Sequence, residues 1–294
     1  MVMSQAPVVG PDQVSRRRAI PDVVLNNGVL MPQLGFGVFL VPDDSVTDAV
    51  GSALECGYRS IDTASAYANE AGVGRALRVA GLPREELFIT TKLWNEDHGY
   101  DQTLRAFEAS LQRLGLNYLD LYLIHWPVPA RGLYADSWRA LNELLEEGSV
   151  RAIGVSNFEP DHIDAVIEAT GTTPAVNQIE LHPYFPQRRL RETATSLNIV
   201  TEAWSPLAPQ TDLLSDPAIA DLARRHDRTP AQIVLRWHIQ LGNVVIPKSV
   251  TPDRIAENID IFGFSLDDAD LAAIAKLDCG MRTGPDPETF FLPT

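Results

Sequence analysis

The chain has 294 residues, and typical domain sizes would divide it into about two domains, although one α/β barrel holds about 250 residues. Hydrophobic residues make up 45% and charged residues 21%, which excludes a wholly disordered chain, a collagen and a disulfide scaffold. Lys and Arg number 24 against 39 Asp and Glu, and the formal net charge of −15 disfavours nucleic acid and anionic membranes as partners.

The N-terminus and the cysteines bear on the cellular compartment. Ser15-Arg16-Arg17-Arg18 is similar to a twin-arginine signal, but no apolar segment follows it, so we expect residues 1–20 to be a flexible tail. Cys56 and Cys279 form no CxxC pair, and so few cysteines favour a reducing cytoplasm. The chain has no run of about 18 apolar residues, so we expect no membrane span.

The first predicted elements are a hairpin and a series of strands. Val23–Leu25 and Val29–Met31 flank Asn26-Asn27-Gly28, and an Asn-Gly pair is a strong turn signal. Eight short apolar runs follow, as is typical of parallel strands covered on both faces. They are Leu34–Phe39, Tyr58–Ile61, Leu87–Ile89, Leu119–Ile124, Ala152–Val155, Ala175–Ile179, Ile199–Ala203 and Val244–Ile246.

Amphipathic segments alternate with these runs. Helices are predicted at 45–56, 101–114, 137–147, 216–226, 230–241 and 253–260. Repeated βα units, eight in number, predict a (β/α)8 TIM barrel that occupies residues 21–294 as one domain. A doubly wound sheet is the competing fold, but Leu34-Gly35-Phe36-Gly37 lies inside the first strand and lacks the third glycine of a dinucleotide fingerprint.

Polar residues stand at the ends of seven consecutive runs, where a barrel carries its chemistry. They are Asp62, Lys92, His125, Ser156 with Asn157, Gln178 with Glu180, Trp204 with Ser205, and Lys248 with Ser249. Each alone also fits a structural role, such as a helix cap or a buried histidine. Together they predict a pocket on one rim of the barrel.

Three of these residues, together with Tyr67 five residues after Asp62, suit one reaction. An ammonium such as Lys92 lowers the pKa of a nearby phenol such as Tyr67, and a carboxylate such as Asp62 keeps the lysine charged. A histidine such as His125 can orient a carbonyl oxygen towards the phenol. This set serves hydride addition to a carbonyl, which leaves negative charge on an oxygen.

The sequence resembles the aldo-keto reductase family from residue 22 to about residue 278, and most closely its bacterial members similar to 2,5-diketogluconate reductase. The ordered motifs that carry the resemblance are Asp62-Thr63-Ala64 with Tyr67, Ile89–Trp94, Asp120–Pro127, Gly154–Phe158, Asn177–Glu180, and Ile246–Ser249 continuing to Asn258. Trp204 and the short loops are the main reason for placing it near the bacterial members.

The resemblance implies a proton donor, Tyr67, tuned by Lys92 and Asp62, with His125 orienting the substrate. It also implies NADPH/NADP+ as the cofactor, lying across the barrel rim. The cofactor contacts implied by the matching positions are Ser156, Asn157 and Gln178 for the carboxamide, Trp204 for the ring, Ser205 and Leu207 for the pyrophosphate, Lys248, Ser249 and Arg254 for the 2′-phosphate, and Glu257 and Asn258 for the adenine.

The implied substrates are small aldehydes, ketones and dicarbonyl compounds. The substrate-binding positions are Phe39, Trp94, His125 and Trp126, and in relatives a C-terminal tail closes the pocket, here through Phe290 or Phe291. We expect a monomer without a metal. Ala208-Pro209-Gln210 replaces a glycine-rich stretch of the family, which would stiffen the loop over the pyrophosphate.

Two other functions remain open. The first is a cofactor-binding regulatory protein, like the channel β-subunits that share this fold, and the complete set of four catalytic types argues against it. The second is a metal-dependent barrel hydrolase, but the six histidines form no HxH or HExxH pair.

Overall fold

The computed structural model describes residues 20–290. Within them, eight parallel strands form one sheet in chain order, so each strand pairs with its sequence neighbours. The strands are β3 (Phe36–Gly37), β4 (Ser60–Asp62), β5 (Phe88–Leu93), β6 (Leu119–Ile124), β7 (Val150–Ser156), β8 (Val176–Glu180), β9 (Val200–Trp204) and β10 (Val244–Val245). The eight predicted strands are confirmed, with ends shifted by a few residues.

The sheet closes into a barrel where its first and last strands meet. Leu34 forms a parallel bridge with Val245, and the Gly35 amide donates to the Val245 carbonyl at 2.8 Å. A Cβ at Gly37 would lie only 2.8 Å from the Ile246 carbonyl oxygen. Gly37 therefore permits this close backbone approach, which explains its presence without a dinucleotide-binding turn.

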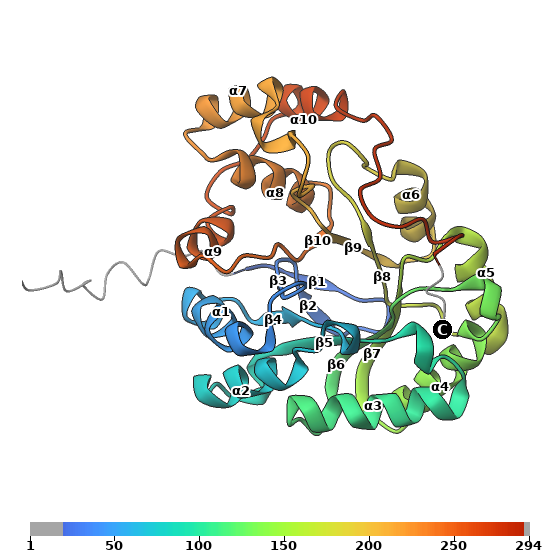
Figure 1. The fold of residues 1–294 in the computed structure, drawn as a ribbon. Helices are drawn as coiled ribbons and strands as arrows, with labels where there is room; N and C mark the ends of the chain where they lie inside the picture. The colour runs from blue at the N-terminus through green and yellow to red at the C-terminus, as the bar shows by residue number, and fades with distance from the viewer. Residues whose placement is uncertain (1–19, 291–294) are drawn as a thin grey trace, which may run out of the picture.

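Helices form a ring outside the strands (Figure 1). They are α1 (Asp43–Cys56), α2 (Glu70–Ala80), α3 (Tyr100–Leu114), α4 (Tyr134–Glu146), α5 (Pro160–Thr170), α6 (Arg188–Ser196), α7 (Pro217–His226), α8 (Pro230–Gln240), α9 (Pro252–Ile259) and α10 (Asp268–Ala275). The six helices predicted by range are present, and α2, α5, α6 and α10 are additional. None of the helices within residues 20–290 has the length and apolar character needed to cross a bilayer.

The predicted hairpin closes the bottom of the barrel. Its strands β1 (Asp22–Val24) and β2 (Leu30–Pro32) pair antiparallel, and Leu25 and Met31 pack with barrel residues such as Phe88 and Leu121. The main hydrophobic core lies between the strands and the helices. The amino ends of the strands are thus covered, which leaves the carboxyl ends for chemistry. The tail predicted at residues 1–20 lies outside the described residues except for Ile20, which packs against the core.

Candidate active site

The four predicted catalytic side chains meet at the carboxyl ends of neighbouring strands. Asp62 ends β4, Lys92 lies in β5, His125 follows β6, and Tyr67 ends a short 3-10 helix, η2 (Ser65–Tyr67). Lys92 is fully buried, and its Nζ donates to Asp62 Oδ1 at 2.6 Å and to the Thr63 carbonyl at 2.9 Å. The same Nζ lies 3.4 Å from Tyr67 Oη, within reach of a hydrogen bond.

The phenol of Tyr67 is a weaker acid than the sequence predicts. Burial raises its pKa above the ordinary value, and the positive charge of Lys92 offsets this only in part. The lowering effect expected from Lys92 is present but outweighed, because the cost of desolvating a phenolate exceeds the attraction of one ammonium. Burial alone would lower the pKa of Lys92, but the negative charge of Asp62, then the interaction with Tyr67 and the hydrogen bond to Asp62, raise it overall. At neutral pH, Tyr67 thus holds its proton and Lys92 its charge.

His125 is a neutral imidazole in this setting. Burial, followed by the charges of Lys92 and His98, lowers its pKa well below the ordinary value. Its ring centroid lies 5.7 Å from that of Tyr67 and 5.1 Å from that of Trp94. A neutral imidazole carries one N–H, which can be donated to a substrate oxygen beside the phenol.

A group of hydrogen-bonded side chains lies beside the catalytic candidates. It consists of Ser156, Asn157, Gln178 and Trp204. Asn157 Nδ2 donates to the His125 carbonyl at 3.0 Å and to Ser156 Oγ at 3.1 Å, while Ser156 Oγ donates to the Gln178 carbonyl. Trp204 Nε1 donates to Asn157 Oδ1 at 2.8 Å, which fixes the indole. The donors of this group are already used, so it offers acceptor oxygens, and these suit the NH2 of a carboxamide.

Two buried glutamates were not assigned a role from the sequence. Glu202 in β9 accepts a 2.8 Å hydrogen bond from Gln178 Nε2, and Glu180 ends β8. The sequence holds a signal for Glu202, because a carboxylate two residues before Trp204 in an apolar strand shares its face of the strand. A side chain on that face lies inside the barrel.

Glu180 binds the C-terminal segment, residues 280–290. Its Oε1 accepts from the Thr283 amide at 2.6 Å and from Thr283 Oγ1 at 2.7 Å, and Oε2 accepts from the Gly284 amide at 2.9 Å. A Cβ at Gly284 would lie 2.4 Å from the Trp204 ring. The segment, red in Figure 1, therefore lies over the ends of β8 and β9.

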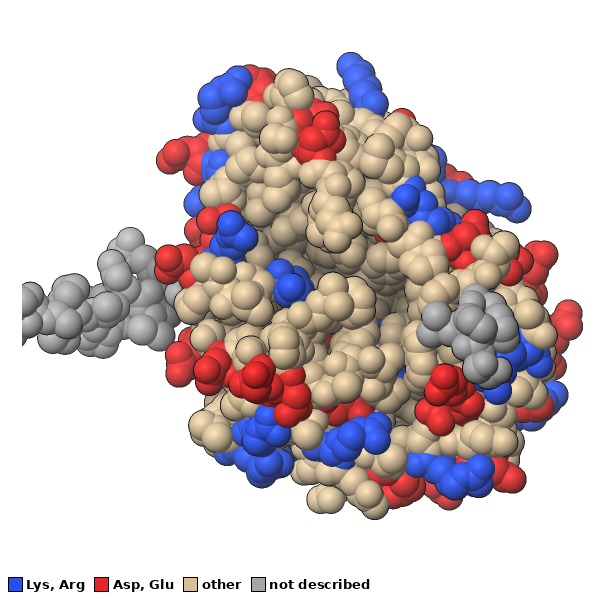
Figure 2. All heavy atoms as spheres, viewed as in Figure 1, with Lys and Arg blue, Asp and Glu red and all other residues tan. Residues whose placement is uncertain are grey.

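Aromatic side chains surround the catalytic candidates. The ring of Phe39, which is 54% exposed, lies 5.0 Å from that of Tyr67, and the Phe290 ring lies 4.5 Å from that of Trp126. Of the two tail residues predicted to close the pocket, Phe290 lies there and Phe291 falls outside the described residues. Figure 2 shows a hollow in the middle of this face, lined mainly by uncharged residues, with both acidic and basic residues around the edge.

The predicted phosphate-binding residues lie at the start of α9. Lys248 and Arg254 are exposed, and neither has an ion-pair partner within residues 20–290. Ser249 Oγ accepts from the Thr251 amide at 3.1 Å, ahead of this helix. Two unpaired cations at a helix N-terminus suit an anion such as a phosphate.

The other four predicted cofactor contacts have side chains that are packed, buried or already hydrogen-bonded, or a strained backbone. Leu207 packs against the core, and Glu257 Oε1 accepts from Thr229 Oγ1 at 2.6 Å. Asn258 is buried, and Ser205 adopts a left-handed backbone with φ of 48°. Of these four, Ser205 and Leu207 follow β9 directly, and Glu257 and Asn258 lie in α9.

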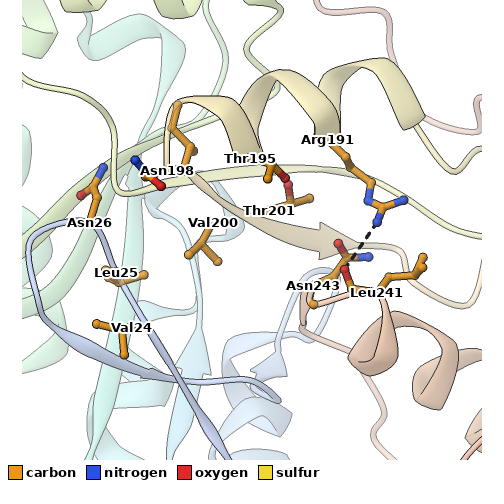
Figure 3. Close-up of a pocket in the computed structure, with 12 residues that line it drawn as sticks. Val24, Leu25, Asn26, Arg191, Thr195, Asn198, Val200, Thr201, Leu241 and Asn243 are labelled. Atoms are coloured by element: carbon orange, nitrogen blue, oxygen red, sulfur yellow. Dashed lines mark hydrogen bonds between the residues drawn. The ribbon is translucent and has the colours of Figure 1, made fainter.

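A cavity of about 490 Å³ lies at the other end of the barrel (Figure 3). It is lined by the hairpin, by α6 and by the amino-terminal end of β9, including Asn26, Arg191 and Val200. None of the predicted site residues lines it. Within residues 20–290, no three His, Cys, Asp or Glu side chains form a candidate metal site.

Comparison with known proteins identifies the relatives of this chain. A model of the aldo/keto reductase family matches residues 33–278. An aldo-keto reductase of Mycolicibacterium smegmatis is 56% identical over 270 residues, covering 92% of this chain and 98% of the relative. The methylglyoxal reductase DkgA of Escherichia coli is 53% identical over 274 residues, with 92% and 99% covered. The crystal structure of a Gox0644 mutant in complex with NADPH superimposes with a TM-score of 0.90 at 50% identity, covering 94% of this chain and all of that one.

Proposed function

Because the chain belongs to the aldo/keto reductase family, we propose that it is an NADPH-dependent reductase that converts aldehydes, ketones or dicarbonyl compounds to alcohols. The observation that carries this proposal is the buried Lys92, which joins the Asp62 carboxylate to the Tyr67 phenol. The name of the Escherichia coli relative supports dicarbonyl substrates, and the aromatic walls Phe39, Trp94 and Trp126 suit small carbonyl compounds.

The residues present fit the cofactor. The acceptor oxygens of Ser156, Asn157 and Gln178 suit its carboxamide, and the fixed indole of Trp204 offers a flat surface for the nicotinamide ring. The exposed cations Lys248 and Arg254, with Ser249, suit the 2′-phosphate. By their positions, Ser205 and Leu207 are proposed contacts of the pyrophosphate, and Glu257 and Asn258 of the adenine.

Bound NADPH would supply the hydride to the carbonyl carbon. As that bond forms, the carbonyl oxygen gains the electron pair of the C=O π bond, and Tyr67 gives it the proton of Oη. Lys92 stabilises the phenolate that remains, while Asp62 keeps the lysine charged and in place. His125 donates its N–H to the same oxygen and so directs it towards the phenol. Solvent protonates Tyr67 again after the alcohol leaves.

The proposal extends to the whole chain. We propose that residues 21–294 act as one domain and as a monomer. A cytoplasmic location is part of the proposal and rests on the low cysteine count.

A substrate panel tests this function. Aldehydes, dicarbonyl compounds and keto-sugars are each assayed with NADPH and with NADH. We expect turnover of several carbonyl compounds and a clear preference for NADPH. Binding of NADPH without turnover of any carbonyl compound would instead support the cofactor-binding regulatory protein.

A further inference from the structure

A second carboxyl group lies inside the barrel beneath the catalytic candidates. Glu202 has no exposed surface, and its Oε2 accepts a hydrogen bond from Gln178 Nε2 at 2.8 Å. Its other oxygen, Oε1, is buried and has no hydrogen-bond partner among residues 20–290. None of the roles proposed above uses this side chain.

Gln178 connects Glu202 to the catalytic group. Its amide nitrogen donates to Asp62 Oδ2 and to Glu202 Oε2, both at 2.8 Å. The reverse orientation would place the amide oxygen against two carboxyl groups that cannot both donate to it, so the contacts fix the orientation. The amide oxygen Oε1 of Gln178 is thereby left to accept from a ligand.

The charges around Glu202 do not balance if it is ionised. Asp62 on β4, Lys92 on β5 and Tyr67 on η2 are the titratable groups that act on it, and Gln178 on β8 is uncharged. The single ammonium, Lys92, already binds Asp62 Oδ1 at 2.6 Å. A second buried carboxylate here would lack a cation of its own, which is costly in a low-dielectric interior.

We propose that Glu202 is a positioning residue that is neutral at physiological pH and that in this form holds Gln178 against Asp62. Its ionisation in alkaline solution slows proton donation by Tyr67. The proposal rests on the proposed reductase function. Burial, and then the charge of Asp62, raise the pKa of Glu202 to about 8, although the Gln178 hydrogen bond and Lys92 lower it. Ionised Glu202 in turn raises the pKa of Tyr67, which opposes the phenolate that forms during reduction.

The first test uses the protein without cofactor or substrate. The pKa of Glu202 rises from an ordinary 4.5 to about 8 in the folded protein. The wild type should therefore lose stability relative to Glu202→Gln as the pH rises from about 4.5 to about 8, and no further above that. Thermal unfolding of both proteins across this range measures the difference. Parallel curves would overturn the proposal.

Glu180→Gln is the matched control for this experiment. Glu180 is also a buried glutamate, on the adjacent strand β8, but its hydrogen bonds lower its pKa despite burial. Its variant should be less stable than the wild type at neutral pH, and the deficit should shrink as the pH falls. The stabilities of the two variants relative to the wild type thus change with pH in opposite directions.

Infrared spectra provide a second readout: a protonated-carboxyl band should be present in the wild type at pH 7 and absent from Glu202→Gln. Absence of that band from the wild type would also overturn the proposal.

The second test is the pH profile of reduction. For a group that ionises near pH 8, the active fraction falls by roughly tenfold between pH 7 and pH 9. In Glu202→Gln this alkaline fall should move to higher pH, and superimposable profiles would overturn the catalytic part of the proposal.

Glu202→Leu removes the acceptor for Gln178 and should weaken NADPH binding more than Glu202→Gln does, whereas equal binding would overturn the positioning part. If the wild type reduces no carbonyl compound at any pH, the proposed function fails, while the stability and infrared tests still decide the protonation of Glu202.

Discussion

At the scale of single residues, the proposed chemistry and the expected stability of the site both depend on the ion pair of Lys92 and Asp62. Both side chains are buried, with the Nζ to Oδ1 distance at 2.6 Å. Lys92→Met leaves the Asp62 carboxylate buried without its cation, so we expect a loss of about 3–5 kcal/mol in the free energy of unfolding. Urea-induced unfolding measures this loss.

The double variant Lys92→Met with Asp62→Asn separates stability from catalysis. It removes both charges, so most of the lost stability should return, while reduction stays abolished because the phenolate has no ammonium beside it. A double variant no more stable than Lys92→Met would show that the unpaired charge is not the cause.

His125 should remain uncharged throughout the working range of pH. Its pKa lies well below the ordinary value of 6.5 because the ring is buried and the charges of Lys92 and His98 act on it. Nitrogen NMR of the imidazole should therefore show one neutral form between about pH 5.5 and about pH 8, the range in which a free histidine titrates. A protonation step of His125 within that range would contradict this account of the site.

At the scale of elements, the C-terminal segment depends on Glu180. Three hydrogen bonds from Thr283 and Gly284 end on this buried carboxylate, and charge-assisted bonds of this kind contribute about 1.5–3 kcal/mol each at most. Glu180→Gln should therefore speed amide hydrogen exchange across residues 280–290 at pH 7. The effect should diminish only in acid below the lowered pKa of Glu180, where the carboxylate of the wild type is protonated as well.

Thr283→Val is the milder companion of that change. It removes the Oγ1 bond to Glu180 and leaves both backbone amides in place, so its effect on exchange should be smaller. Equal exchange in the wild type and Glu180→Gln would show that other contacts, such as Phe290 with Trp126, hold the segment.

The strands and their polar ends could be predicted from the sequence, since each apolar run stops where a residue such as Asp62 or His125 reaches the rim. The contacts of Glu202 and of the C-terminal segment could not. Glu202 sits inside an apolar run, and its partner Gln178 is known only once the barrel sets the register of β8 and β9. Glu180 and Thr283 are 103 residues apart, and local patterns do not report such a pairing. The raised pKa of Tyr67 also depends on burial, which the motif spacing does not show.

At the scale of the whole molecule, a net charge of −15 repels an anionic cofactor at long range. Local cations must overcome this, and the proposed ones are Lys248, just before α9, and Arg254 in its first turn. Lys248→Ala with Arg254→Ala should weaken NADPH binding by roughly tenfold to a hundredfold and NADH binding much less, as expected for the loss of two charged contacts. Fluorescence titration with both cofactors measures this, and an equal loss for both would show that these cations do not bind the 2′-phosphate.

The proposed reduction depends above all on Tyr67, which is proposed to donate the proton that completes it. Tyr67→Phe keeps the ring and removes Oη, and Tyr118→Phe is a control at the other end of the barrel, where the ring lies under Arg84. The measurement is the turnover of a carbonyl substrate by each variant, together with its dissociation constant for NADPH. We predict that Tyr67→Phe loses about 10²–10⁴-fold in turnover and binds NADPH as the wild type does, while Tyr118→Phe retains both. Turnover near the wild-type rate in Tyr67→Phe would contradict the account.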